Sequence, residues 1–144
     1  MNRLYGYVPV FKDYAPESMA ATPAHIVARK RALRGGPISL RADTFDQYVG
    51  GANLPVVVNF WARWCSLSKA MAPHFATGAR KLAGRAMFAT VEKDEEASLA
   101  TRYGIECVPT LIVLRNGQEI ERHCGAMTAG RLAVWLAPLL RKTI

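Results

Sequence analysis

The chain has 144 residues, enough for one domain with a sizeable core, and its 51% hydrophobic and 21% charged residues are ordinary for a soluble protein. No apolar run approaches the roughly 18 residues of a membrane helix, and the N-terminus lacks the apolar stretch of a secretory signal, so we expect a cytoplasmic protein with no membrane partner. The net charge is +8, but no aromatic stacking motif accompanies the basic residues, so we expect no nucleic-acid partner either.

Residues 1–36 differ from the rest of the chain. They carry three prolines and end in a Gly35-Gly36-Pro37 stop, and their hydrophobic periodicity is weak apart from a short basic helix that residues 24–33 favour. We therefore expect a partly ordered basic extension over 1–36 and a folded domain over 37–144.

From residue 38 onward, strands alternate with helices. The residue patterns predict strands at 38–40, 56–61, 86–91, 110–114 and 119–124, and helices at 43–49 with Asp43 as N-cap, at 66–82, at 95–103 and after Thr128. The helix at 66–82 contains Pro73, which should kink it, and its predicted apolar stripe comprises Leu67, Ala70, Met71, Phe75, Ala79 and Leu82.

The strand at 56–61 is apolar on both faces, which is typical of the central strand of a covered sheet. Asn116-Gly117 predicts a tight hairpin between the last two strands. The predicted order is β-α-β-α-β-α-β-β-α, an α/β domain with a mixed sheet whose last hairpin is antiparallel.

The segment Phe60-Trp61-Ala62-Arg63-Trp64-Cys65 resembles the thioredoxin family, in which a strand, an aromatic-rich turn and a Cys-x-x-Cys helix follow one another. Further motifs follow in the family's order: Pro73 in the active-site helix, the segment 103–110 with the family's cis-proline at Pro109, the Asn116-Gly117 hairpin, and the Gly125-Ala126 loop. The resemblance covers roughly residues 38–140 and implies the thioredoxin fold, a central mixed β-sheet flanked by helices.

The N-terminal extension is similar in length and position to the zinc-binding segment of one bacterial thioredoxin subgroup. It contains no cysteine, so we expect no metal there, and the resemblance implies no cofactor.

The sequence departs from the family pattern at four places. Ser68 replaces the second cysteine, Ser66-Leu67 replaces the usual Gly-Pro, Asn59 replaces the buried acid beneath the active site, and Thr90 replaces a lysine on the neighbouring strand. Asn59 is consistent with Ser68, because the buried acid helps to move a proton to or from a second thiol that this chain lacks.

Cys65 is the candidate nucleophile. It lies at a predicted helix N-terminus, where free N–H groups and the macrodipole favour a thiolate, and a Ser68 hydroxyl bond and the Lys69 charge should favour it further. Attack on a disulfide would give a mixed disulfide that Ser68 cannot resolve, because a neutral hydroxyl does not displace a thiolate.

The chain has three cysteines, and their odd number and wide spacing predict thiols rather than a disulfide framework. Cys107, two residues before Pro109, is predicted to be a passive thiol. Two alternatives remain open, resolution of a mixed disulfide at Cys65 and pairing with a second chain. We expect Cys124 to be a small core residue.

Trp64 is expected on the surface beside the thiol, where the resemblance implies an apolar platform for an extended substrate peptide. The other members of this platform are Val108, Pro109, Gly125 and Ala126. We expect the histidines, His25, His74 and His123, to be surface or capping residues.

The sequence therefore predicts a thiol–disulfide oxidoreductase with a single nucleophilic cysteine, Cys65, that forms mixed disulfides with protein or glutathione partners. Thioredoxin reductase is a further candidate partner, and we expect a monomer, with a dimer linked through Cys107 as the alternative. Two other functions remain open: a redox-inactive peptide-binding or chaperone module, and a dithiol thioredoxin whose resolving cysteine has been mutated to Ser68.

Overall fold

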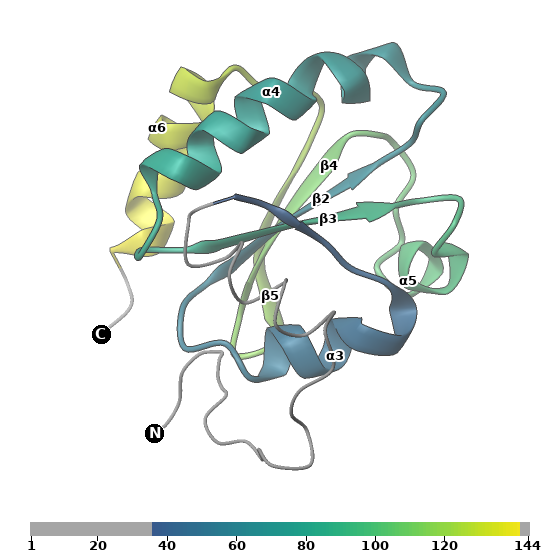
Figure 1. Ribbon diagram of the computed structural model, residues 1–144, viewed down its shortest axis with the longest axis horizontal. Coiled ribbons are helices and arrows are strands. Elements are labelled where there is room, and N and C mark those ends of the chain that lie inside the picture. The colour runs from purple at the N-terminus through teal and green to yellow at the C-terminus, as the bar shows by residue number, and fades with distance from the viewer. Residues whose placement is uncertain (1–35, 142–144) are drawn as a thin grey trace.

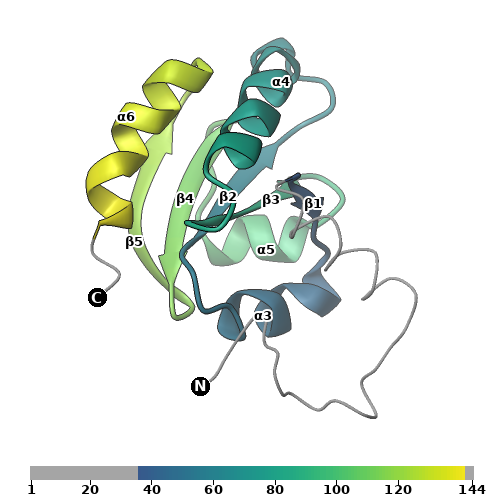
Figure 2. The same cartoon turned by 60° about the vertical axis from the view of Figure 1, so that its left-hand side comes forward.

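The computed structural model of the protein describes residues 36–141, which form one mixed sheet covered on both faces by helices. Helices α4 and α6 cover one face, and α3 and α5 lie on the other (Figure 1, Figure 2). The expected extension, its helix at 24–33 and His25 lie outside the described residues. No helix within residues 36–141 is long and apolar enough to cross a membrane.

Strands and helices alternate in the predicted order, and the thioredoxin fold is confirmed. The strands are β1 Ile38–Ser39, β2 Val56–Trp61, β3 Met87–Glu92, β4 Thr110–Arg115 and β5 Gln118–Cys124. The helices are α3 Ala42–Gly50, α4 Ser66–Lys81, α5 Ala97–Arg102 and α6 Ala129–Leu140.

The strand order in the sheet is β1-β3-β2-β4-β5, which places the continuous apolar run of β2 at its centre, as predicted. β2 pairs with β3 in parallel and with β4 antiparallel, and β4 and β5 form the antiparallel hairpin. Asn116 and Gly117 turn that hairpin with φ of 53° and 78°, the left-handed conformation that a two-residue hairpin turn requires.

The sheet separates two hydrophobic clusters, because successive side chains of a strand point to opposite faces. Val57 of β2 packs with the buried residues of α4 and α6, whereas Val58 and Phe60 pack with those of α3 and α5. By the same alternation, Asn59 lies on the face that α4 covers. β2 ends at Trp61, and a short turn joins it to the start of α4 at Ser66.

Two local expectations were wrong. The N-cap of α3 is Arg41 rather than Asp43, which lies inside the first turn and pairs with the Arg41 guanidinium at 2.9 Å. The apolar stripe of α4 includes Ser68 but excludes Leu67, which is 57% exposed, and Ala70, which is also exposed. The helical period explains this, because Ser68 lies three and seven residues before the buried Met71 and Phe75, whereas Leu67 lies one position off that face.

Candidate active site

Cys65 is the N-cap residue of α4, at the junction where the buried strand β2 turns into the helix. Its side chain is half-buried and is the one free cysteine among residues 36–141. α4 has 16 residues, so its aligned peptide dipoles and its unpaired first N–H groups are directed toward the sulfur. The predicted position of Cys65 at a helix start is confirmed.

The surroundings of Cys65 favour its charged form. Hydrogen bonds from the backbone N–H and from the side chain of Ser68 lower the pKa of the Cys65 thiol, with a smaller contribution from the Leu67 N–H. Partial burial opposes them, but the net pKa lies below the ordinary value of a thiol. The charge of Lys69 does not contribute to the lowered pKa of Cys65, contrary to expectation.

Ser68 is held firmly beneath the sulfur. Its side chain is 1% exposed, and its hydroxyl oxygen accepts a hydrogen bond from the backbone N–H of Ala62 at 3.3 Å. This bond ties the first turn of α4 to the loop that follows β2. Ser68 therefore positions the segment that carries Cys65 as well as donating toward its sulfur.

Asn59 lies on the α4 face of β2, where the family's acid is expected. It is 3% exposed, and no hydrogen-bond partner is found for its side-chain oxygen among the described residues. The β2–β3 register pairs Asn59 with Thr90, so two of the positions at which the sequence departs from the expected pattern are neighbours. An uncharged amide costs less to bury here than a carboxylate would.

The loop that precedes β4 contacts Cys65 through Val108. The Cys65 thiol donates to the Val108 carbonyl oxygen at 3.6 Å, and the Val108–Pro109 peptide bond is cis. The Gly125 N–H donates to the Pro109 carbonyl at 2.8 Å, which brings the end of β5 to the same place. Val108 and Gly125 are half-buried, Ala126 is exposed and Pro109 is buried, and the four lie close together at one end of the sheet.

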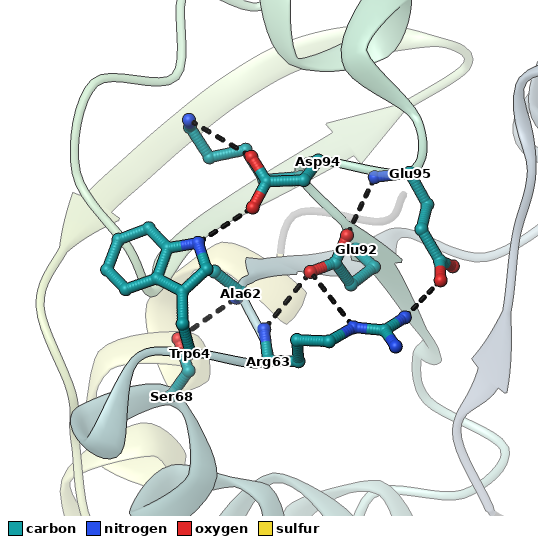
Figure 3. A network of polar contacts seen from close by, with 8 residues as sticks. Ala62, Arg63, Trp64, Ser68, Glu92, Asp94 and Glu95 are labelled. Atoms are coloured by element: carbon teal, nitrogen blue, oxygen red, sulfur yellow. Dashed lines mark hydrogen bonds and ion pairs between the residues drawn. The ribbon is translucent and has the colours of Figure 1, made fainter.

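Trp64 is 65% exposed beside Cys65, in agreement with its predicted surface position. Its indole N–H donates to the Asp94 carboxylate at 2.7 Å, which favours one orientation of the ring (Figure 3). Leu67, also exposed, adds a second large apolar side chain to this region.

Glu92, which was not among the predicted site residues, anchors the turn before Cys65. This carboxylate is 5% exposed and accepts the backbone N–H groups of Arg63 at 3.0 Å and Glu95 at 2.7 Å (Figure 3). The Arg63 guanidinium also pairs with Glu95. One signal was available, because β2 and β3 are parallel neighbours and an acid at the end of β3 lies beside the residues that follow β2.

Two expectations about the remaining cysteines were wrong. Cys107 and Cys124 form a disulfide with Cα atoms 6.3 Å apart, so neither is a thiol in this structure. Cys124 is exposed at the end of β5 rather than in the core, because β5 is an edge strand whose residues are exposed or half-buried on both faces. With its sulfur bonded inside the chain, Cys107 has no free thiol here for a second chain or for a mixed disulfide at Cys65.

The histidines of the described residues take structural positions. His74 Nδ1 accepts the N–H of Ala129 at 3.0 Å, at the first residue of α6, which confirms a capping role. His123 packs against Trp135 with the two rings tilted by 58° and their centroids 5.9 Å apart. No group of three or more His, Cys, Asp or Glu side chains within residues 36–141 is placed to hold a metal ion.

Comparison with known proteins gives concordant results. The Thioredoxin family model matches residues 36–138. The chain is 31% identical over 106 residues to Thioredoxin C-3 of Corynebacterium nephridii, covering 74% of this chain and 72% of that protein. It is 36% identical over 90 residues to Thioredoxin 1 of Synechococcus elongatus, covering 62% of this chain and 84% of the relative. The crystal structure of Malassezia sympodialis thioredoxin superimposes with a TM-score of 0.67 at 32% identity, over 74% of this chain and 93% of that one.

Proposed function

This chain belongs to the thioredoxin family of thiol–disulfide oxidoreductases, and from that premise we propose that it exchanges disulfides through Cys65 as its single nucleophile. Cys65 attacks a disulfide of a protein or of glutathione, one thiolate leaves, and the other half of the substrate stays bound as a mixed disulfide. A thiol from outside the motif then releases it, because Ser68 cannot.

The arrangement of Cys65 and Ser68 carries this proposal. Cys65 is the N-cap residue of a 16-residue helix, the pKa of its thiol is lowered chiefly by Ser68, and its side chain is partly accessible. A thiolate that is stabilised and reachable is the form that attacks disulfides. The residue at the resolving position is a buried hydroxyl that accepts a hydrogen bond from Ala62; it supports the thiolate but does not attack a mixed disulfide.

Substrates dock, in this proposal, as extended peptides across Trp64 and Val108, with the backbone around Pro109 pairing with the peptide in the manner of strand addition. The exposed indole ring, held by Asp94, provides an apolar surface at low entropic cost. The cytoplasm, where thiol partners are plentiful, is the proposed location.

A mass-spectrometric assay tests the role of Cys65. The chain with Cys107–Cys124 bonded is incubated with glutathione disulfide, quenched with acid and mapped by peptide digestion. We expect one glutathione per chain, attached to Cys65, and none on a Cys65→Ser variant. An unmodified wild-type chain would contradict the proposal and favour a redox-inactive peptide-binding module.

A second assay separates monothiol from dithiol function. Insulin reduction is measured with thioredoxin reductase and, separately, with glutathione alone, for the wild type and for Ser68→Cys. We expect the wild type to use glutathione alone, because an external thiol can release Cys65. Activity confined to Ser68→Cys with the reductase would instead identify a dithiol enzyme inactivated at position 68.

A further inference from the structure

The Cys107–Cys124 disulfide lies at the same edge of the sheet as Cys65. Cys107 directly precedes Val108, whose carbonyl oxygen is 3.6 Å from the Cys65 sulfur. Cys124 directly precedes Gly125, whose N–H donates to Pro109 at 2.8 Å. All three cysteines of the chain are therefore gathered around the loop that faces the nucleophile.

The disulfide is placed where thiolates can reach it. Cys107 is half-buried and Cys124 is exposed, and a disulfide outside the core is open to thiol exchange. Consecutive Cα atoms are about 3.8 Å apart, so the Cys107 backbone adjoins the residue that contacts Cys65. The sulfur of Cys107 is also 3.5 Å from the Thr110 hydroxyl, which holds it near the start of β4.

Hydrogen bonds also join the two backbone segments that the disulfide links. Cys124 pairs with Thr110 in the β4–β5 ladder, and Gly125 bonds to Pro109 directly after it. The Cα separation of 6.3 Å lies within the range that a disulfide spans, so the bond can open and close while the strands stay paired. This is what a reversible redox pair requires, as opposed to a clamp that holds the fold together.

We propose that Cys107 and Cys124, when reduced, are the resolving pair that the Cys65–Ser68 motif lacks, and that they release substrates from Cys65 by two successive exchanges. This inference rests on the proposed role of Cys65 as the nucleophile. The Cys107–Cys124 disulfide described here is then the oxidised end state of one turnover.

The steps balance without a further co-reactant. The Cys65 thiolate attacks the substrate disulfide, and one substrate thiolate leaves. The Cys107 thiolate attacks the Cys65 sulfur of the mixed disulfide, the second substrate thiolate leaves, and a Cys65–Cys107 bond forms. The Cys124 thiolate then attacks the Cys107 sulfur, and Cys65 leaves as a thiolate. The substrate gains two electrons and the two protons of the Cys107 and Cys124 thiols. A small thiol such as glutathione, or a dithiol, reopens the pair for the next turnover.

A single-turnover experiment tests this sequence. The fully reduced chain, freed of reductant, is mixed with a disulfide-linked dimer of a short cysteine peptide, quenched with acid and analysed by intact mass and peptide mapping. We expect two peptide thiols released per chain, a product two hydrogens lighter than the reduced chain, a Cys107–Cys124 bond, and Cys65 as a thiol.

Serine variants should stop the sequence at different points. We expect Cys107→Ser to accumulate the peptide on Cys65, with one peptide thiol released per chain. We expect Cys124→Ser to release both peptides and to end with a Cys65–Cys107 bond. Two different trapped species would not arise if the pair were merely structural.

Three contrary outcomes can be told apart. A wild-type chain that accumulates the peptide on Cys65 as Cys107→Ser does would overturn the resolving role while leaving Cys65 as the nucleophile. A Cys124→Ser chain that holds the peptide on Cys65 would overturn the proposed order. A wild-type chain that forms no adduct and releases no peptide would refute the proposed function itself.

Discussion

Replacing Asn59 with aspartate tests whether water reaches this buried position. Aspartate is the residue type that the resemblance implies beneath the active site. The side chain is 3% exposed, and its oxygen has no partner among the described residues. A carboxyl group introduced there by Asn59→Asp loses its hydration without gaining a cation. Burial then raises its pKa in the folded state above the value of about 3.9 in the unfolded chain.

The sign of the effect follows from proton binding. Above pH 3.9 or so, the unfolded chain releases the proton while the folded chain keeps it, so the free energy of unfolding falls as the pH rises. The fall is about 1.4 kcal/mol per pH unit until the raised pKa is reached. If the folded carboxyl stays protonated up to neutral pH, the loss reaches about 4 kcal/mol there, a large part of the roughly 5–15 kcal/mol typical of a domain.

Urea denaturation followed by tryptophan fluorescence, repeated from about pH 4.5 to about pH 7.5, measures this slope against the wild type. Asn116→Asp is the matched control, because it makes the same chemical change in the exposed hairpin turn and should follow the wild-type slope. Parallel curves for the two variants would refute the reasoning, since they would mean that water reaches position 59.

Two further variants test the site and its support. We expect Ser68→Ala to raise the pKa of Cys65 toward its ordinary value, because the side-chain hydrogen bond is lost, whereas Ser66→Ala on the exposed side should leave it unchanged; equal alkylation-rate midpoints would contradict this. We expect Gly78→Ala to lower the free energy of unfolding by about 1–3 kcal/mol relative to Gly130→Ala. A Cβ at Gly78 meets a buried leucine methyl of α6 at 2.7 Å, whereas one at Gly130 meets nothing within 4 Å. Equal urea midpoints would contradict this prediction, because they would mean that the packing of α4 against α6 adjusts to the added methyl group at no cost.

Local patterns determined most of the fold. The apolar run of β2, the Asn116-Gly117 turn and the Thr128 cap of α6, whose side chain accepts the Arg131 N–H at 3.2 Å, are signals confined to a few residues. The apolar face of α4 was predicted wrongly at Leu67 and Ala70, which are exposed, and Ser68 was left out of it because its side chain is polar although it is buried.

The parts of the candidate site that lie within one sequence motif could be predicted. The parts formed by residues far apart in the sequence could not. Cys65 and Trp64 lie in the motif, and their positions follow from the strand-to-helix turn. The bond between Cys107 and Cys124 was missed because it joins residues 17 positions apart across the β4–β5 hairpin, and its existence depends on the register of that ladder. Glu92 was missed for a similar reason, since its partners are backbone N–H groups that no sequence pattern marks.

The central claim is that Cys65 is a stabilised thiolate at the start of α4. The rate of its alkylation by iodoacetamide, measured against pH with Cys107–Cys124 kept bonded, reports the pKa of this one thiol. The account predicts a midpoint clearly below the value of about 8.5 for an ordinary cysteine. A midpoint at or above that value would contradict it, because a protonated sulfur at neutral pH would have no advantage as a nucleophile.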